Sequence, residues 1–249
     1  GKHRHADALS GLNAIEVITS AAMQSDIELL YRDWFALLNR GHRIFAVGSS
    51  DSHDVNRFVL GQGRTYAMAK DDDPAAVNLG EVWRSYHEGR LLVSLGLLVT
   101  MTVDGRFGIG DTATGLGDML KGECVIQSPS WTHADKLQIY ANGHLVHVIA
   151  LTNEKRITWQ MPKPLHDVHL VAIATGPGVT KPFWEIPRPY QPSSKTFTPR
   201  VIGSTNPIWI DADGDGRFQS AYEIAKKLIE QGGSIEKHDA AVKEQATGL

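Results

Sequence analysis

The sequence predicts an α/β plus all-β chain: an α/β segment, an antiparallel β-sandwich-like domain and a C-terminal helix. Residues 14–48 read as strand, amphipathic helix and strand, which is the order found in α/β proteins. From about residue 91 the hydrophobic period changes to short β-like runs separated by Gly, Asn, Asp and Pro clusters. A helical period returns at 221–231. We therefore expect three segments with boundaries at 1–95, 96–205 and 206–249.

Both expected helices carry recognisable ends. In the first helix, Ser25 and Glu28 have the spacing of a reciprocal capping box, apolar residues follow at helical spacing, and Gly41 ends the pattern. This helix would pack on one side of a parallel sheet formed by the two strands that flank it. Ser220 and Glu223 form the same capping pattern at the start of the last helix.

Polar residues follow the second strand, at the point where α/β proteins bind ligands. In an extended Asp-x-His, the side chains of Asp51 and His53 project to the same face. A carboxylate oxygen and an imidazole nitrogen can then bind one metal ion, and this ligand pair suits zinc, manganese or iron. An Asx-type turn with a surface histidine explains the same residues. Arg64, which follows two glycines, is a candidate catalytic residue that could bind a phosphate or carboxylate, or could pair with an acid of the protein.

The β-like region is expected to form an antiparallel sandwich. Its apolar runs lie at 91–103, 124–126, 137–140, 145–151, 157–159 and 168–174. Asn142 and Gly143 between two of these runs predict a two-residue hairpin turn. Four histidines occur here in two pairs with a spacing of three, which places the members of a pair on opposite faces of a strand and favours surface or cross-strand roles over a metal site. These are His144, His147, His166 and His169.

A short acidic stretch precedes the last helix. Asp211, Asp213 and Asp215 alternate and are followed by glycine, as in the first half of an EF-hand-type calcium loop. The twelfth position is Tyr222 instead of the expected Glu, and Glu223 is one residue late. The stretch is therefore either a partial calcium site, in which the three aspartates act with backbone oxygens, or an acidic turn.

Several motifs occur in the order seen in one known family. The motifs are Ala14-Ile-Glu-Val17, Trp34 to His42, Ala46 to His53, Gly63-Arg-Thr-Tyr66, Gly89 to Gly96, Thr102 to Gly105 and Gly110-Asp111. This succession resembles the last third of a PHP (polymerase and histidinol phosphatase) domain and, more narrowly, the CehA/McbA-like metallohydrolases at the junction between barrel and C-terminal β-domain. The resemblance covers most of residues 14–111 and, more loosely, residues 206–218.

The resemblance implies the C-terminal part of a PHP-type distorted β/α barrel that holds a cluster of two or three metals. Asp51 and His53 match the last ligand motif of that family. The early strands, with a first His-x-His, are missing. His3 and His5 have this spacing but not its position, so they are either a remnant of a mid-domain metal-binding histidine or part of a flexible basic chain start. The implied activity is hydrolysis of a phosphoester, carbamate or amide by metal-activated water, and with so few ligands we expect the isolated chain to be inactive.

Composition limits the other classes of function. The net charge is −3 without a long basic run, so nothing suggests nucleic-acid binding, and no apolar stretch approaches the roughly 18 residues of a membrane span. The single Cys124 excludes an intrachain disulfide and is expected to be a small buried hydrophobic residue.

The sequence does not identify the substrate, which could be a small molecule or a polymer, and an oligomer is possible. A calcium-type loop weakly favours an extracytoplasmic setting. The alternative function is a non-catalytic β-sandwich module that binds a carbohydrate or a protein.

Overall fold

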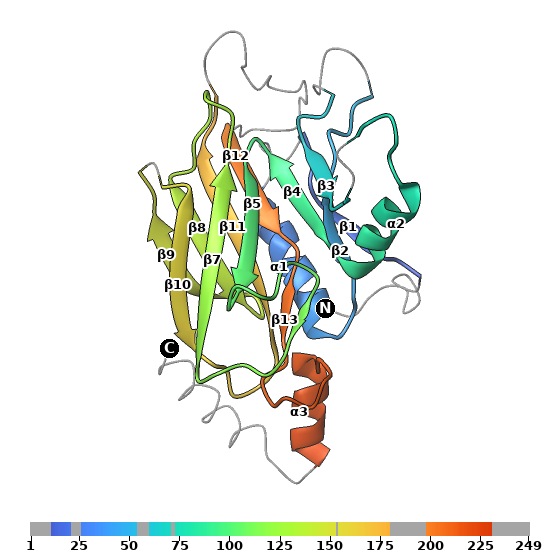
Figure 1. Cartoon of the computed structure of the whole chain (residues 1–249), viewed down its shortest axis with the longest axis vertical. Helices are drawn as coiled ribbons and strands as arrows, with labels where there is room; N and C mark the ends of the chain where they lie inside the picture. Colours follow the sequence, from blue (N-terminus) through green and yellow to red (C-terminus); the bar gives the residue numbers. More distant parts are fainter. Residues whose placement is uncertain are drawn as a thin grey trace.

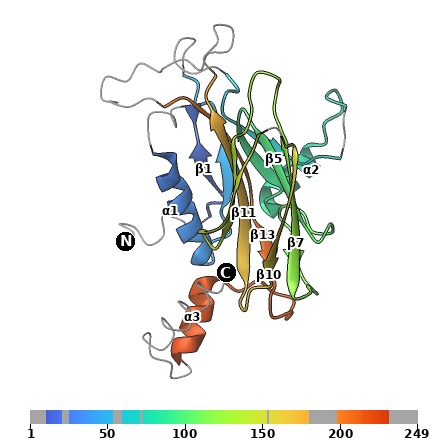
Figure 2. The same cartoon turned by 90° about the vertical axis from the view of Figure 1, so that its left-hand side faces the viewer.

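The computed structural model describes residues 11–20, 26–53, 60–70, 73–152, 154–179 and 198–230. Two β-sheets pack face to face, and helix α1 lies with a small parallel sheet on the outer face of the larger one. Figure 1 shows the chain from the side of the smaller sheet, and Figure 2 shows α1 on one side of β11 and β7 on the other. This is the β-sandwich-like arrangement that the sequence predicts.

The described residues form three helices and thirteen strands. The helices are α1 (Ile27–Asn39), α2 (Leu79–Glu88) and α3 (Ala221–Glu230). The strands are β1 (Ala14–Ile18), β2 (Phe45–Gly48), β3 (Arg64–Ala67), β4 (Leu91–Leu95), β5 (Leu98–Val103), β6 (Thr112–Ala113), β7 (Met119–Gln127), β8 (Lys136–Ala141), β9 (His144–Ala150), β10 (Arg156–Pro162), β11 (Val168–Pro177), β12 (Arg200–Thr205) and β13 (Ile208–Ile210). None of the described helices has the length and apolar character that a membrane span requires.

The larger sheet has the order β3-β4-β12-β11-β13-β6, and β8 joins it through β11 and carries β9 at its edge. The smaller sheet has the order β10-β7-β5. Strand β11 lies at the centre and is apolar on both faces, as expected for a strand that is covered on two sides. Its residues Leu170 and Ala172 belong to the core between the two sheets, whereas Val171 and Ile173 belong to the core beneath α1.

The core between the sheets confirms the period-two pattern of the sequence. Strands β7 and β10 alternate buried and outward-facing residues. Cys124 of β7 is fully buried among apolar neighbours, as predicted. The expected hairpin joins β8 to β9, and Asn142 and Gly143 both have the positive φ that this turn needs, 48° and 79°.

The helix ends agree only in part with the sequence. The N-cap of α1 is Asp26, whose carboxylate accepts a hydrogen bond from the backbone N–H of Glu28 at 3.0 Å, so the prediction of Ser25 as the cap was one residue early. An aspartate accepts from the helix N-terminus at least as well as a serine does. The capping box of α3 is formed as predicted, because the N–H of Ser220 donates to Glu223 at 2.8 Å and the N–H of Glu223 donates to the Ser220 hydroxyl at 3.2 Å.

Strands β1 and β2 pair in parallel and are connected through α1, as the strand–helix–strand pattern predicts. They form a separate two-stranded sheet. Side chains attach this sheet to the larger one: Asn206 bonds to the backbone of Ala46 in β2, and the hydroxyl of Thr65 bonds to the N–H and C=O of Gly48 at 2.9 and 2.8 Å. The end of β2 is thereby fixed against the sandwich.

The expected boundary after residue 95 falls between β4 and β5. Strand β4, on its N-terminal side, pairs with β12 from the expected sandwich segment, and β3 pairs with β4. Two strands that the sequence assigns to the α/β segment therefore extend the larger sheet of the sandwich. Within the described residues the α/β part is the single β1–α1–β2 unit, and the sheets there are open and do not close into a barrel.

Candidate functional site

The candidate metal ligands Asp51 and His53 follow β2 on the surface. The sequence analysis assumed an extended Asp-x-His. The backbone there is not extended, because Asp51 has a φ of 51°. This left-handed conformation is uncommon for a residue with a side chain. It nevertheless brings the pair together: Nδ1 of His53 lies 2.7 Å from the carbonyl oxygen of Asp51 and 3.6 Å from its carboxylate oxygen Oδ1.

The hydrogen bond of His53 decides which ring nitrogen can act as a ligand. In the tautomer in which Nδ1 donates to the Asp51 carbonyl, Nε2 keeps its lone pair. Metal-binding histidines commonly have their second nitrogen held in this way by a carbonyl or a carboxylate. The nitrogen that lies 3.6 Å from the Asp51 carboxylate is the bonded Nδ1, so the two side chains would have to turn for Nε2 and the carboxylate to share one metal ion. The turn with a surface histidine that the sequence left open accounts for the arrangement as it stands.

Glu16 lies at the same edge, although the sequence analysis did not single it out. It belongs to β1 opposite Val47 of β2, and its carboxylate accepts a hydrogen bond from the hydroxyl of Ser49. The same hydroxyl accepts from the N–H of Asp51 at 3.2 Å. Ser49 thus connects the acid of one parallel strand to the loop after the other. The signal in the sequence was a single exposed acid within the otherwise apolar run 14–18.

Among the described residues the Arg64 side chain makes no contact with Glu16, Asp51 or His53, although its backbone lies beside the end of β2, where a Cβ on Gly48 would come within 3.0 Å of the Arg64 carbonyl oxygen. Its neighbour Thr65 faces β2, so Arg64 and Tyr66 project from the opposite face of β3. The guanidinium lies 6.0 Å from the ring centre of Tyr66, with a long bond of 3.4 Å from Nη1 to the phenolic oxygen. Its Nε is buried and has no hydrogen-bond partner in the described part of the chain. His3 and His5 lie outside the described residues.

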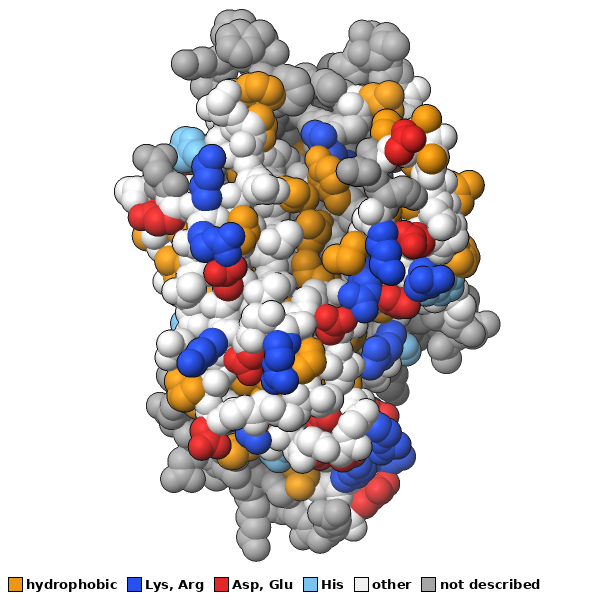
Figure 3. Space-filling model, in the orientation of Figure 1, with side chains coloured by type: hydrophobic (Ala, Val, Ile, Leu, Met, Phe, Trp, Pro, Cys, Tyr) orange, Lys and Arg blue, Asp and Glu red, His pale blue; other side chains and the backbone are white. Residues whose placement is uncertain are grey.

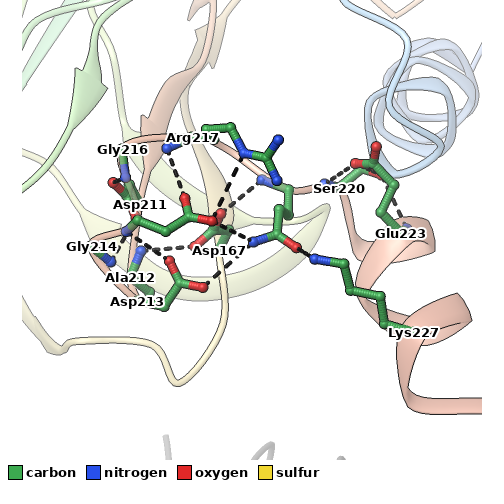
Figure 4. Close-up of polar contacts among 12 residues, drawn as sticks. Asp167, Asp211, Ala212, Asp213, Gly214, Gly216, Arg217, Ser220, Glu223 and Lys227 are labelled. Atoms are coloured by element: carbon green, nitrogen blue, oxygen red, sulfur yellow. Dashed lines mark hydrogen bonds and ion pairs between the residues drawn. The ribbon is translucent and has the colours of Figure 1, made fainter. Parts of the chain in front are cut away.

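A second candidate site lies where the acidic loop meets the turn before β11. One carboxylate oxygen from each of Asp167, Asp211 and Asp213 lies within 4.8 Å of the others, and no other group of three or more His, Cys, Asp or Glu in the described ranges converges in this way. Figure 4 shows these carboxylates gathered at the start of the loop. The sequence predicted Asp211 and Asp213, but its third aspartate, Asp215, is not in the group.

Backbone N–H groups hold the two buried aspartates of this cluster. Asp211 accepts from Gly214 at 2.8 Å and from Gly216 at 2.9 Å. Asp167 accepts from Ala212 at 2.8 Å and from Gln219 at 2.7 Å. These bonds fold the loop around the carboxylates as in an ion-binding turn, and they also fit the acidic turn that was the alternative.

The carboxylates of the cluster lie close enough to repel one another. Burial raises the pKa of Asp167, the backbone N–H groups of Gln219 and Ala212 oppose this, and the negative charges of Asp213 and Asp211 raise it further. Asp215 instead accepts from the Gln219 side chain at 3.1 Å and lies 3.9 Å from the Arg217 guanidinium. Oxygen ligands on a glycine-containing loop suit calcium.

An open groove of about 870 Å³ lies between α1 and the β8–β9 hairpin. Its floor is the α1-facing side of the larger sheet, where Leu145 and Val148 of β9 are 47% and 58% exposed. Tyr31, Phe35, Gln138 and Tyr140 are among the residues that line it. Figure 3 draws the other side of the molecule, that of the smaller sheet, where basic and acidic side chains are interspersed. A groove of this size is large enough for a small ligand.

No protein-family model, curated protein or solved structure matches the chain. The geometry of the residues therefore carries the functional argument.

Proposed function

We propose that the chain is the C-terminal portion of a metal-dependent hydrolase of the PHP type. The observation that supports this best is the β1–α1–β2 unit, since its parallel strands place Glu16 beside the loop that carries Asp51 and His53. Carboxylates and one imidazole at the ends of parallel strands are a suitable donor set for zinc, manganese or iron. The resemblance of the motifs to CehA/McbA-like proteins points to the same class.

Each residue has a distinct part in this proposal. Asp51 and His53 would hold a divalent metal, and Glu16, whose carboxylate does not converge with their side chains in the structure, would have to move closer to add a third ligand; Ser49 bonds to Glu16 at this edge. A divalent metal bound there would supply a water of lowered pKa and would polarise a phosphoester, carbamate or amide. Arg64, directed to the other face of β3, would need a rearrangement to contact the same substrate.

Metal content and hydrolysis test the proposal. We expect Co²⁺ or Mn²⁺ to bind weakly to the purified chain, with the affinity lowered at least about tenfold by Asp51→Ala or His53→Ala because each removes one of very few ligands. Asp118→Ala and His144→Ala, which change exposed residues elsewhere, are the matched controls. We expect little or no hydrolysis by the isolated chain. Binding that is insensitive to both ligand variants would refute the proposed metal site, and turnover abolished by a chelator would contradict the expected inactivity.

A non-catalytic binding module is the second candidate, and the groove between α1 and the β8–β9 hairpin favours it. A carbohydrate or peptide bound there would contact Tyr140 and Val148 without involving Asp51. Screening of glycans and peptides should then give a ligand whose affinity is lost in Val148→Asp and retained in Asp51→Ala. A ligand that responds only to Asp51→Ala would exclude this reading.

We also propose that the acidic cluster binds calcium through Asp167, Asp211 and Asp213. Calorimetric titration should show Ca²⁺ binding that Asp213→Asn weakens by at least about tenfold, since one anionic ligand is lost. Asp215→Asn, which changes an aspartate outside the cluster, is the control. Equal effects of the two substitutions, or no binding at millimolar Ca²⁺, would refute the calcium site and would mean that the stretch is an acidic turn. An extracytoplasmic setting, where calcium is plentiful, is part of the same proposal.

A further inference from the structure

Asn206 lies between β12 and β13 and is fully buried. Its side-chain oxygen accepts from the N–H of Ala46 at 2.8 Å, and its side-chain nitrogen donates to the carbonyl oxygen of Ala46 at 2.9 Å. The same nitrogen donates to the carbonyl oxygen of Leu91 at 3.0 Å. One amide therefore satisfies three backbone groups on two strands.

These bonds replace the neighbouring strand that β2 lacks. On one edge β2 pairs with β1, but β1 and β2 form a sheet of their own and β2 has no backbone ladder to β4. The amide of Asn206 offers one acceptor and two donors, so it can bond to both groups of Ala46 as a neighbouring strand would. An aspartate would lack both donors, and an apolar residue would leave buried backbone groups unpaired.

The strand that Asn206 holds leads directly to the candidate metal ligands. Strand β2 ends at Gly48, and Ser49, which bonds Glu16 and the backbone of Asp51, follows at once. A shift of β2 along or away from the larger sheet would move this loop with it. Thr65 fixes only the last residue of the strand, whereas Asn206 fixes its second residue.

We propose that Asn206 is a positioning residue for the metal-binding edge: its amide holds β2 in the register that sets the position of Asp51 and His53. This inference rests on the proposed function for its metal, but the contact with β2 can be measured without it. The role differs from general packing because the amide acts through hydrogen bonds to Ala46 of β2 and Leu91 of β4.

Hydrogen exchange and Co²⁺ absorption spectra test the inference. In Asn206→Ala, we expect backbone amides of β2 to exchange at least about tenfold faster while those of β7 and β11 keep their rates, because Ala46 of β2 and Leu91 of β4 lose a bonding partner whereas β7 and β11 lose none. Co²⁺ titration followed by the visible absorption bands should give an apparent Kd raised at least about tenfold. Asn206→Ser, which can keep one bond to Ala46, should be intermediate in both measurements.

Thr205→Val is the matched control, because Thr205 is equally buried and its hydroxyl accepts from the N–H of Ala172 on β11 and not from β2. It should leave β2 exchange and the Co²⁺ spectrum unchanged. Unchanged exchange of β2 in Asn206→Ala would overturn the inference. So would a loss of protection spread equally over β7 and β11, or the failure of both Asn206 variants to fold where Thr205→Val folds. Absence of Co²⁺ binding by the wild-type chain would refute the proposed function instead, and β2 exchange would still decide the role of Asn206.

Discussion

Acidification should destabilise the protein through one buried histidine. His169 of β11 is fully buried, with ring centres 6.0 Å from Phe35 and 6.0 Å from Trp209. Neither ring nitrogen has a hydrogen-bond partner among the described residues. Burial lowers the pKa of His169 from 6.5 to about 3, so the imidazole stays neutral in the folded protein.

The sign of the effect follows from proton binding in the two states. Above pH 6.5 neither state binds a proton at His169, and the residue contributes no pH dependence. Between pH 6.5 and 3 the unfolded chain binds a proton and the folded protein does not, so the free energy of unfolding falls as the pH falls. The loss amounts to about 3 kcal/mol at pH 4.5 and approaches about 5 kcal/mol near pH 3.

Urea unfolding at pH 7.5 and 4.5 in the presence of EDTA, followed by tryptophan fluorescence, measures this contribution. His169→Leu removes the titrating group, so the difference in unfolding free energy between wild type and variant should change by about 3 kcal/mol between the two pH values. His144→Leu, at an exposed histidine of β9, is the matched control for the loss of an imidazole. A constant difference for His169→Leu would refute the reasoning and would mean that the folded protein accommodates the charged ring.

Three other substitutions test the packing of the fold. Tyr31→Phe removes the buried 2.7 Å bond from its hydroxyl to Ser204 and should cost about 1 to 2 kcal/mol in urea unfolding; a double-mutant cycle with Ser204→Ala that shows no coupling would contradict this. Gly122→Ala places a methyl 1.9 Å from an indole carbon of β10 and should cost about 1 to 3 kcal/mol, whereas Gly117→Ala, where the space is open, should be nearly neutral; similar costs for both would refute the clash. Burial raises the pKa of the Cys124 thiol to about 12, so a thiol reagent should modify it only after denaturation, and rapid labelling of the native protein would show that β7 opens.

Local pattern predicted the elements of this fold better than their partners. The period-two runs, the Asn142-Gly143 turn and the capping box of α3 depend on residues that are close in sequence, and the structure confirms them. The pairing of β4 with β12 joins residues more than a hundred positions apart, and no local signal encodes such a contact. The apolar run 91–103 was expected to be part of the sandwich, but its partner β12 could not be inferred, because the hydrophobic pattern of such a run fits a strand in either sheet.

The histidines show the same limit. Odd spacing predicted opposite faces for His166 and His169, but it could not indicate which face was buried. Surface or cross-strand roles were expected for all four histidines. For His169 this was wrong in part: it does lie across from Trp209, but it does so inside the core beneath α1, because a second layer covers that face of β11. A sequence period reports the orientation of a side chain relative to its strand, and the burial of that face depends on elements elsewhere in the chain.

The two candidate sites differ in how far sequence could define them. Asp51 and His53 were singled out because both candidate ligands sit in one short motif, and the turn that unites them is equally local. For the acidic cluster, the sequence identified Asp211 and Asp213 but not Asp167. Asp167 bonds to Ala212, 45 positions later, and its carboxylate lies with those of Asp211 and Asp213, whereas that of Asp215 does not. A buried carboxylate from a distant turn can complete a coordination set whenever the fold brings it close. For this reason an incomplete loop motif such as 211–216 does not define which carboxylates the fold brings together.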